Sequence, residues 1–289
     1  KSMESLKITV VMVTYNRSKV VSEAIDCLQK QTYPIENIII IDNCSTDDTL
    51  EVLSKRKSAD PRIQFRMRNE NGGYAAGLET GILWGLSDFE TDYFWMMDDD
   101  SYPVPDALEL LVKGISSYKY DMLGLSGFKM TTTTKVTIEP QEEVQTVDYI
   151  LIDNALVRKG VAEKVGAPNP DFFMMCEDYE YCLRIKKAGF KIGVMKNNHV
   201  NRLHLGSQKF SKATLWRGYY HSRNHLIILR QYFSWNMMIH YILMQLKYLF
   251  GSFSAPDRFT RIKFRLIGIY HGLIGKKGKT LRPDTLKFQ

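Results

Sequence analysis

The chain has 289 residues, of which 44% are hydrophobic and 12% aromatic, so it can bury a large apolar core and is not a disordered protein. Its formal net charge of +7 is unevenly distributed, because residues 1–195 carry 22 basic and 30 acidic side chains whereas residues 196–289 carry 17 basic and 2 acidic ones. The four cysteines show no metal-binding spacing and no secretory signal peptide is recognised, so we expect a cytoplasmic protein in a reducing compartment.

The N-terminal third alternates between buried strands and helices. Runs of β-branched and aromatic residues predict four strands, in the segments LKITVVMVTYNR (6–17), NIIIIDN (37–43), IQFRMRN (63–69) and YFWMMD (93–98). Apolar residues at helical spacing follow the first strand and stop before Pro34, and Ser45 with Asp48 forms a capping-box pattern for the next helix. This order indicates βαβ units, hence an α/β fold with a mostly parallel, Rossmann-like sheet covered by helices.

The rest of the chain is less regular. MLGLSGFKM (122–130) indicates a further strand, and TTTTKVT (131–137) an edge strand or a mobile loop. RKGVAEKVGAP (158–168) predicts a short helix, and CEDYEYCLRIKKAGF (176–190) predicts an amphipathic helix that stops at Gly189. From about Leu215 the chain becomes aromatic, Met-rich and basic. We therefore expect an α/β domain over residues 1–212 and a helical region over residues 213–289.

Three consecutive carboxylates, Asp98–Asp100, stand at the end of the fourth predicted strand. In open α/β sheets ligands bind beyond the carboxyl ends of the strands, and carboxylate oxygens suit Mg²⁺ or Mn²⁺. Alternation along an extended segment would place Asp98 and Asp100 on one side and Asp99 on the other. The two carboxylates on one side could then hold a divalent ion that also binds a diphosphate. A solvated acidic loop or a helix cap is the alternative interpretation.

Five segments stand in the order seen in one enzyme family. They are VVMVTYNR, IIIIDNCSTDDT, NENGGYAAGLETG, WMMDDD and CEDYEYCLR. The ordered set, over roughly residues 7–205, resembles the inverting family 2 glycosyltransferases of the GT-A fold, and the Gly-rich third segment resembles their rhamnosyltransferase and galactofuranosyltransferase branch. The resemblance implies a catalytic domain over residues 1–212 that binds a nucleotide-sugar together with Mn²⁺ or Mg²⁺.

The resemblance also implies roles for individual residues. The donor-binding residues would be Thr14, Tyr15, Asn16, Arg17, Asp42, Asn43, Asn71, Gly72, Gly73, Asp98 and Asp99. The metal ligands would be Asp98, Asp100 and His204, with His199 as the alternative to His204. A carboxylate such as Asp42 can accept the N3–H of a uracil or thymine ring, although an Asx turn that opens the loop also explains an aspartate at this position.

Glu177 and Asp178 begin the amphipathic helix and would be the catalytic residues. An inverting transfer needs a general base, because a sugar hydroxyl is a poor nucleophile until its proton is removed. The resemblance assigns this role to the second acid of the pair, Asp178. The alternative is that both carboxylates only complement the helix dipole in the first turn.

The C-terminal region allows two interpretations. The segment NMMIHYILMQLKYLFGSF (236–253) contains polar interruptions, so we do not expect it to span a membrane. Together with the basic and apolar segment RFTRIKFRLIGIYHGLIGKKGK (258–279), it predicts a helix pair lying on an anionic membrane surface. A dimer interface or a core-packing extension is the alternative. Four residues of the preceding helix could contact a diphosphate or an acceptor, namely Tyr219, Tyr220, Arg223 and Asn224.

We therefore expect a metal-dependent, inverting hexosyltransferase that uses a UDP- or dTDP-sugar such as UDP-galactofuranose, UDP-galactose or dTDP-rhamnose. Its acceptor would be a saccharide or a lipid-diphosphate-linked saccharide in surface polysaccharide biosynthesis, at the inner face of the cell membrane and without nucleic acid. Its oligomeric state stays open. A nucleotidyltransferase is one alternative, and it would consume a nucleoside triphosphate and release diphosphate. A non-catalytic module that binds anionic membranes or polymers is the other, and it would tolerate Asp100→Ala and Asp178→Asn.

Overall fold

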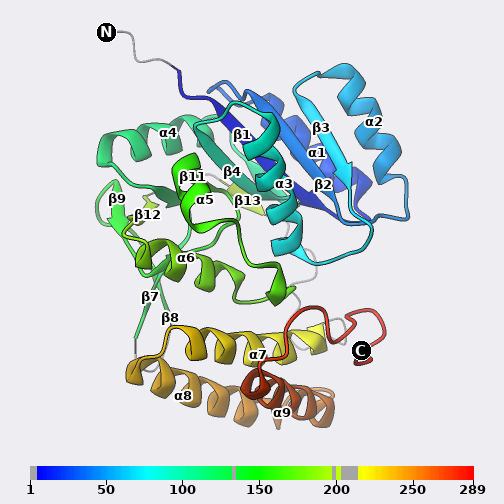
Figure 1. Cartoon of the computed structure of the whole chain (residues 1–289), viewed down its shortest axis with the longest axis vertical. Helices are drawn as coiled ribbons and strands as arrows, with labels where there is room; N and C mark the ends of the chain where they lie inside the picture. Colours follow the sequence, from blue (N-terminus) through cyan, green and yellow to red (C-terminus); the bar gives the residue numbers. More distant parts are fainter. Residues whose placement is uncertain (1–4, 132–134, 197–199, 203–213) are drawn as a thin grey trace.

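The computed structural model describes residues 5–131, 135–196, 200–202 and 214–289. An eight-stranded sheet forms the centre of its larger part (Figure 1). In spatial order the strands are β3 (Ile63–Met67), β2 (Asn37–Asp42), β1 (Ile8–Thr14), β4 (Tyr93–Asp98), β11 (Ala155–Arg158), β6 (Met122–Gly124), β12 (Ile192–Met195) and β9 (Val144–Thr146). Only β11 and β9 run against the other strands of this sheet. The prediction of an α/β fold with a mostly parallel sheet is confirmed.

Helices cover both faces of the sheet, and for this reason every residue of β1 is buried. On one face, β1 packs against α1 (Ser18–Gln29), α2 (Thr49–Ala59) and α4 (Ala107–Tyr118). On the other face lie α3 (Tyr74–Asp88), α5 (Lys159–Val165) and α6 (Glu177–Lys187). The helix α3 approaches β1 closely because glycines face the strand, and a Cβ at Gly77 or Gly81 would lie 2.5 or 2.4 Å from a valine side chain of β1.

Two predicted local features are wrong. The segment 122–130 forms two strands in different sheets, because the chain leaves the large sheet after β6 and pairs again as β7 (Gly127–Met130). β7 lies between β10 (Tyr149–Ile150) and β8 (Lys135–Ile138), which makes β8 an edge strand. The capping box does not form either. The hydroxyl of Ser45 binds the carboxylate of Asp42 instead, and α2 begins only at Thr49.

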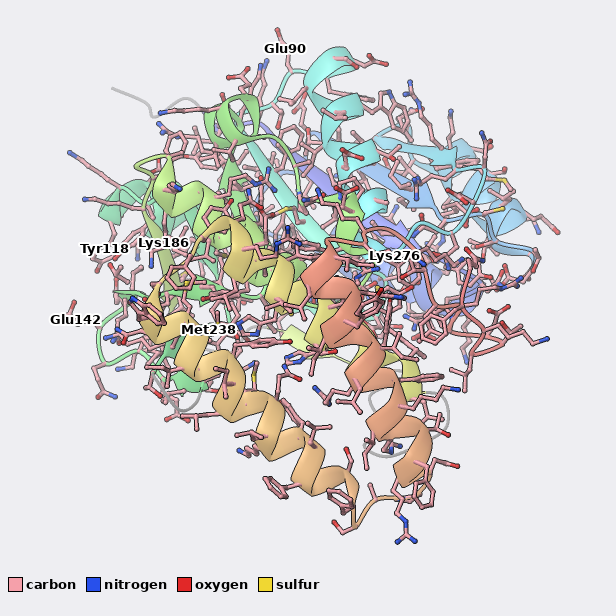
Figure 2. All side chains as sticks on the ribbon, turned by 60° about the horizontal axis from the view of Figure 1, so that its bottom comes forward. Glu90, Tyr118, Glu142, Lys186, Met238 and Lys276 are labelled. Carbon is pink, nitrogen blue, oxygen red and sulfur yellow. The ribbon has the colours of Figure 1, made fainter. Side chains whose placement is uncertain are left out.

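The C-terminal region consists of α7 (Leu215–Gln231), α8 (Trp235–Ser252) and α9 (Arg258–Ile274), which lie together at one end of the molecule (Figure 1). α7 belongs to the body, because Ile227 and Ile228 are part of the same hydrophobic cluster as the sheet. α8 and α9 lie farther out and come forward in Figure 2. Among the described residues, no helix combines the length and the hydropathy needed to cross a membrane.

Candidate active site

The predicted acidic cluster forms a tight turn at the carboxyl end of β4. The strand ends at Asp98, the next two residues turn, and β5 (Ser101–Pro103) follows at once. Because of this turn the expected alternation is wrong: Asp98, Asp99 and Asp100 each offer one carboxylate oxygen, and these three atoms lie within 4.8 Å of one another. An all-oxygen donor set of this size fits a hard divalent cation such as Mg²⁺ or Mn²⁺.

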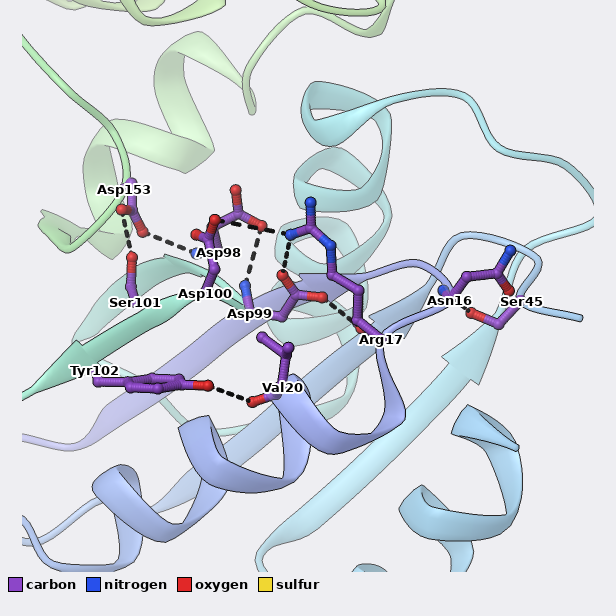
Figure 3. Close-up of polar contacts among 11 residues, drawn as sticks. Asn16, Arg17, Val20, Ser45, Asp98, Asp99, Asp100, Ser101, Tyr102 and Asp153 are labelled. Carbon is purple, nitrogen blue, oxygen red and sulfur yellow. Dashed lines mark hydrogen bonds and ion pairs between the residues drawn. The ribbon is translucent and has the colours of Figure 1, made fainter. Parts of the chain in front are cut away.

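Residues after β1 hold this turn in place (Figure 3). The carboxylate of Asp99 accepts a hydrogen bond from Thr14 Oγ1 at 2.7 Å and another from Arg17 Nη1 at 2.8 Å. The same guanidinium nitrogen lies 3.7 Å from a carboxylate oxygen of Asp100. Burial raises the pKa of Asp99, and the contacts with Arg17 and Thr14 oppose that rise. The contacts of Thr14 and Arg17 with the acidic turn, which were not predicted, have a direct physical cause: they compensate buried negative charge.

Asp153 and its neighbour Ile152, which the sequence interpretation missed, connect the acidic turn to the helix α6. The carboxylate of Asp153 accepts hydrogen bonds from the backbone nitrogen of Asp98, at 2.8 Å, and from the hydroxyl of Ser101 (Figure 3). The backbone nitrogen of Ile152 donates to Asp178 Oδ1 at 2.9 Å. Ile152 and Asp153 are consecutive residues, so their Cα atoms are about 3.8 Å apart. The acidic turn and Asp178 are therefore held by adjacent residues of one segment. The sequence does contain a signal for these residues: Asp153 and Asn154 follow the apolar run YILI in the same way as Asp42 and Asn43 follow the run IIII.

Glu177 and Asp178 occupy the first turn of α6, as predicted, but their environments differ. Glu177 is buried, and among the described residues its Oε2 has no hydrogen-bond partner. Burial, and after it the charge of Asp178, raises the pKa of Glu177 to about 8. Burial thus favours the protonated form of Glu177, whereas Asp178 accepts a hydrogen bond from the backbone nitrogen of Ile152.

The predicted nucleoside-binding residues after β1 and β2 form one connected loop system. The backbone nitrogen of Asn16 donates to Ser45 Oγ at 2.8 Å, and its side-chain oxygen accepts from Thr46 N at 2.7 Å. Tyr15 next to it is exposed. Asp42 is fully buried, and both of its carboxylate oxygens accept hydrogen bonds from Ser45. Asp42 therefore forms the turn that was the alternative interpretation of this residue. Contact between Asp42 and a base stays a prediction.

Asn43, Asn71, Gly72 and Gly73 bring a third loop to this edge of the sheet. Asn43 Nδ2 donates to the carbonyl of Gly73 at 3.0 Å, and Asn71 Oδ1 accepts from the backbone nitrogen of Gly73 at 3.0 Å. Gly73 has φ of +87°, and a Cβ there would lie 1.9 Å from the carbonyl oxygen of Phe173. The loop 71–73 thus touches the segment that leads into α6. His199 and His204 lie outside the described residues.

The sequence of residues 9–165, more than half of the chain, matches the family described as Glycosyl transferase family 2. The chain belongs to glycosyl transferase family 2. Among curated relatives, the glycosyltransferase GlyA of Streptococcus pneumoniae is 30% identical over 116 residues, which are 40% of this chain and only 16% of GlyA.

Two solved structures share the fold. A TarS fragment from Staphylococcus aureus has a TM-score of 0.61 and 15% identity, over 92% of this chain and 81% of that one. A mannosyltransferase from Pyrobaculum calidifontis in complex with GDP-Man and Mn²⁺ has a TM-score of 0.58 and 14% identity, over 93% and 75%. The GT-A fold expected from the order of the motifs is confirmed.

In this family 2 protein, α7 supports the start of α6 through buried polar side chains. The prediction that its polar residues touch a diphosphate or an acceptor is wrong, because all four are fully buried: Tyr219, Tyr220, Arg223 and Asn224. Arg223 Nη2 donates to the carbonyl of Phe172 at 3.2 Å, and Asn224 Nδ2 donates to the carbonyls of Met174 and Met175 at 2.8 Å. These bonds fix the loop immediately before Glu177.

Proposed function

We propose that this family 2 protein is a metal-dependent, inverting glycosyltransferase that uses a UDP- or dTDP-sugar and extends a saccharide or lipid-linked acceptor in surface polysaccharide synthesis. The observation that carries the proposal is the hydrogen-bonded segment Ile152–Asp153, which joins the carboxylate-rich turn to Asp178. Two chemically different acidic groups at one edge of an α/β sheet suit a transfer reaction with a metal-bound donor and a base for the acceptor. Galactofuranose, galactose, glucose and rhamnose are the sugars to test first.

Two solved structures support the choice of donor chemistry. TarS has been determined in complex with UDP, with a TM-score of 0.54 over 93% of this chain. The mannosyltransferase complex contains GDP-Man and Mn²⁺. In this chain Asp98 and Asp100 would hold the cation, with His204 as the further ligand. A cation there would neutralise charge on the leaving diphosphate.

The residues of the chain would divide the remaining work. Arg17 and Thr14 hold the acidic turn, and Asn43 with the loop 71–73 would line the nucleotide-sugar pocket. Asp178 would take the proton of the acceptor hydroxyl while the acceptor oxygen bonds to the anomeric carbon. The bond from that carbon to the diphosphate oxygen breaks at the same time, and the nucleoside diphosphate leaves with the bonding electrons. A single displacement of this kind inverts the anomeric configuration.

The test compares Asp178→Asn with Glu177→Gln, two amide substitutions at adjacent positions. We expect Asp178→Asn to bind the nucleotide donor with Mn²⁺ as the wild type does and to lose transfer by roughly 10²–10⁴-fold, the usual contribution of a general base. Glu177→Gln should keep most of the activity, because the acid that it replaces is already neutral near pH 7. Equal turnover by wild type and Asp178→Asn would exclude the assignment of the base.

We also propose that α8 and α9 bind an anionic membrane surface. Apolar side chains gather on their exposed faces, with Trp235, Phe250 and Phe259 each at least 70% exposed. The only acidic residue between 235 and 274 is Asp257, whereas five residues there are basic. Exposed aromatic and aliphatic groups interspersed with lysine and arginine suit the interface of an anionic bilayer.

Vesicle flotation tests this membrane proposal. Wild-type protein should float with vesicles that contain phosphatidylglycerol and not with pure phosphatidylcholine, and a Phe250→Ser, Phe259→Ser double variant should lose binding by at least about tenfold. Leu83→Ser is the matched control, since Leu83 is 52% exposed on α3, in the opposite part of the molecule. A stable dimer that does not bind vesicles would refute the proposal and favour a protein interface.

A further inference from the structure

A second group of metal-binding side chains lies beside the start of α6. His221 and His225 are four residues apart on α7, so both side chains are on the same face of that helix. Cys176 is the residue before α6. One ligand atom from each of these three residues lies within 4.8 Å of the other two. The group contains one sulfur and two nitrogens, unlike the all-oxygen group of Asp98–Asp100.

One ring nitrogen of each histidine in this group is buried without a hydrogen-bond partner among the described residues. His225 is only 4% exposed, and among the described residues neither His225 Nε2 nor His221 Nδ1 has a hydrogen-bond partner. Buried polar atoms in native proteins are nearly always hydrogen-bonded, because an unsatisfied one costs about 1–3 kcal/mol. Burial lowers the pKa of His225 to about 4, so its imidazole is neutral and can bind a metal.

The backbone before α6 is held in a conformation that directs the thiol toward α7. Phe173, Met175 and Cys176 have φ values of 62°, 73° and 67°, which are uncommon for residues other than glycine. Such strain persists only where the surrounding structure imposes it, and it concentrates at functional sites. The sulfur of Cys176 lies 3.9 Å from the carbonyl oxygen of His221. The strained turn therefore places the thiol against the helix that carries both histidines.

We propose that Cys176, His221 and His225 form a site for Zn²⁺ or a similar transition-metal ion. One thiolate and two imidazoles are a ligand set that zinc prefers and that magnesium does not. A tetrahedral ion needs a fourth ligand, which a water molecule would supply. A cavity of about 410 Å³ borders His225, one of the three proposed ligands.

The charges around the thiol are mixed. Burial, and then the charges of Glu177 and Asp178, raise the pKa of Cys176, whereas Lys135 and Arg223 act in the opposite direction. The thiol is therefore protonated without a metal, and binding replaces that S–H bond by a sulfur–metal bond and releases one proton to water. The negative charge of Asp178 favours a cation. A bound ion would tie the first turn of α6 to α7, and this inference does not depend on the proposed transferase reaction.

Cobalt titration of the full chain distinguishes this site from the acidic turn. With excess Mg²⁺ present to fill oxygen sites, Co²⁺ should produce a near-ultraviolet sulfur-to-metal charge-transfer band together with intense visible bands of a tetrahedral ion. Zn²⁺ should abolish both and raise the melting temperature by roughly 5 °C at a hundredfold excess over Kd. Asp100→Ala should leave these signals unchanged.

Three variants complete the test. Cys176→Ser should lose the charge-transfer band, and His221→Gln should weaken Co²⁺ binding by at least about tenfold, since even the loss of a residue that only orients a metal ligand costs about 10- to 100-fold in affinity. Cys27→Ser is the control, because Cys27 is a half-buried thiol on α1. Circular dichroism checks that each variant folds. Absence of the sulfur band in the wild type, its persistence in Cys176→Ser, or its loss in Cys27→Ser would each overturn the proposal.

Discussion

Asp153→Asn tests the connection between the two acidic centres. The wild-type carboxylate accepts hydrogen bonds from Asp98 N and from Ser101 Oγ. A hydrogen bond to a charged group contributes about 1.5–3 kcal/mol to stability. The asparagine side chain can accept only one of the two hydrogen bonds, because its amino group would face the other donor. We therefore expect a loss of about 2 kcal/mol in the free energy of unfolding. Because the acidic turn also loses a nearby negative charge and its anchor, Mn²⁺-dependent nucleotide binding should weaken by about 10- to 30-fold, equivalent to about 1.4–2 kcal/mol.

Isothermal titration of UDP or dTDP in the presence of Mn²⁺, and urea unfolding, measure the two effects. Asp148→Asn is the matched control, because Asp148 also accepts a backbone hydrogen bond, from Met130 N at 2.8 Å, but does not touch the acidic turn. It should lose stability without losing affinity. If Asp153→Asn bound the nucleotide as tightly as Asp148→Asn does, the segment Ile152–Asp153 would not position the site, and the argument for the proposed function would lose its main support.

Two further predictions concern Glu177 in α6 and Gly73 in the loop 71–73. The pKa of Glu177 is raised from 4.5 to about 8, so the folded state holds this proton more tightly than the unfolded state, and the stabilisation is lost as the pH rises toward 8. When the pH rises from about 6 to about 8, the free energy of unfolding measured in urea should fall by on the order of 2 kcal/mol more in the wild type than in Glu177→Gln. The same dependence of stability on pH in both proteins would contradict this. Gly73→Ala should lower the free energy of unfolding by at least about 2–3 kcal/mol, because Gly73 has a φ of +87° and a Cβ there would clash with Phe173. A fall in the melting temperature of less than about 2 °C would contradict this and show that the loop 71–73 moves easily away from Phe173.

The strands and helices of the first half follow from the sequence because βαβ units impose short connections and strands that are buried on both faces. The acidic turn was predictable for the same reason: the carboxyl end of a central parallel strand is a ligand site in this class of fold. Its detailed geometry was not, because alternation assumes an extended backbone through Asp100, whereas the strand ends at Asp98 and the next two residues turn. The capping box failed because the Asp42 carboxylate competes successfully for the Ser45 hydroxyl.

Other parts of the site depend on contacts between distant segments. Asp153 follows a strand of only two residues, Tyr149–Ile150, which no periodicity can reveal. The group of Cys176, His221 and His225 has no recognisable spacing, because the cysteine precedes α6 whereas both histidines lie on α7. The polar residues of α7 suggested ligand contacts, yet a buried arginine can equally well satisfy the carbonyl groups of a strained loop, as Arg223 does.

The position of α7 has a practical consequence for anyone who wishes to shorten or recombine this protein. A polypeptide that stopped at residue 212 would leave the partners of Ile227 and Ile228 facing water and would remove the donors that restrain residues 172–175. Chimeras with homologous enzymes should therefore keep α7 with the sheet and also keep residues 278–281, because Thr280 and Leu281 hydrogen-bond the hydroxyls of Tyr219 and Tyr220 on α7.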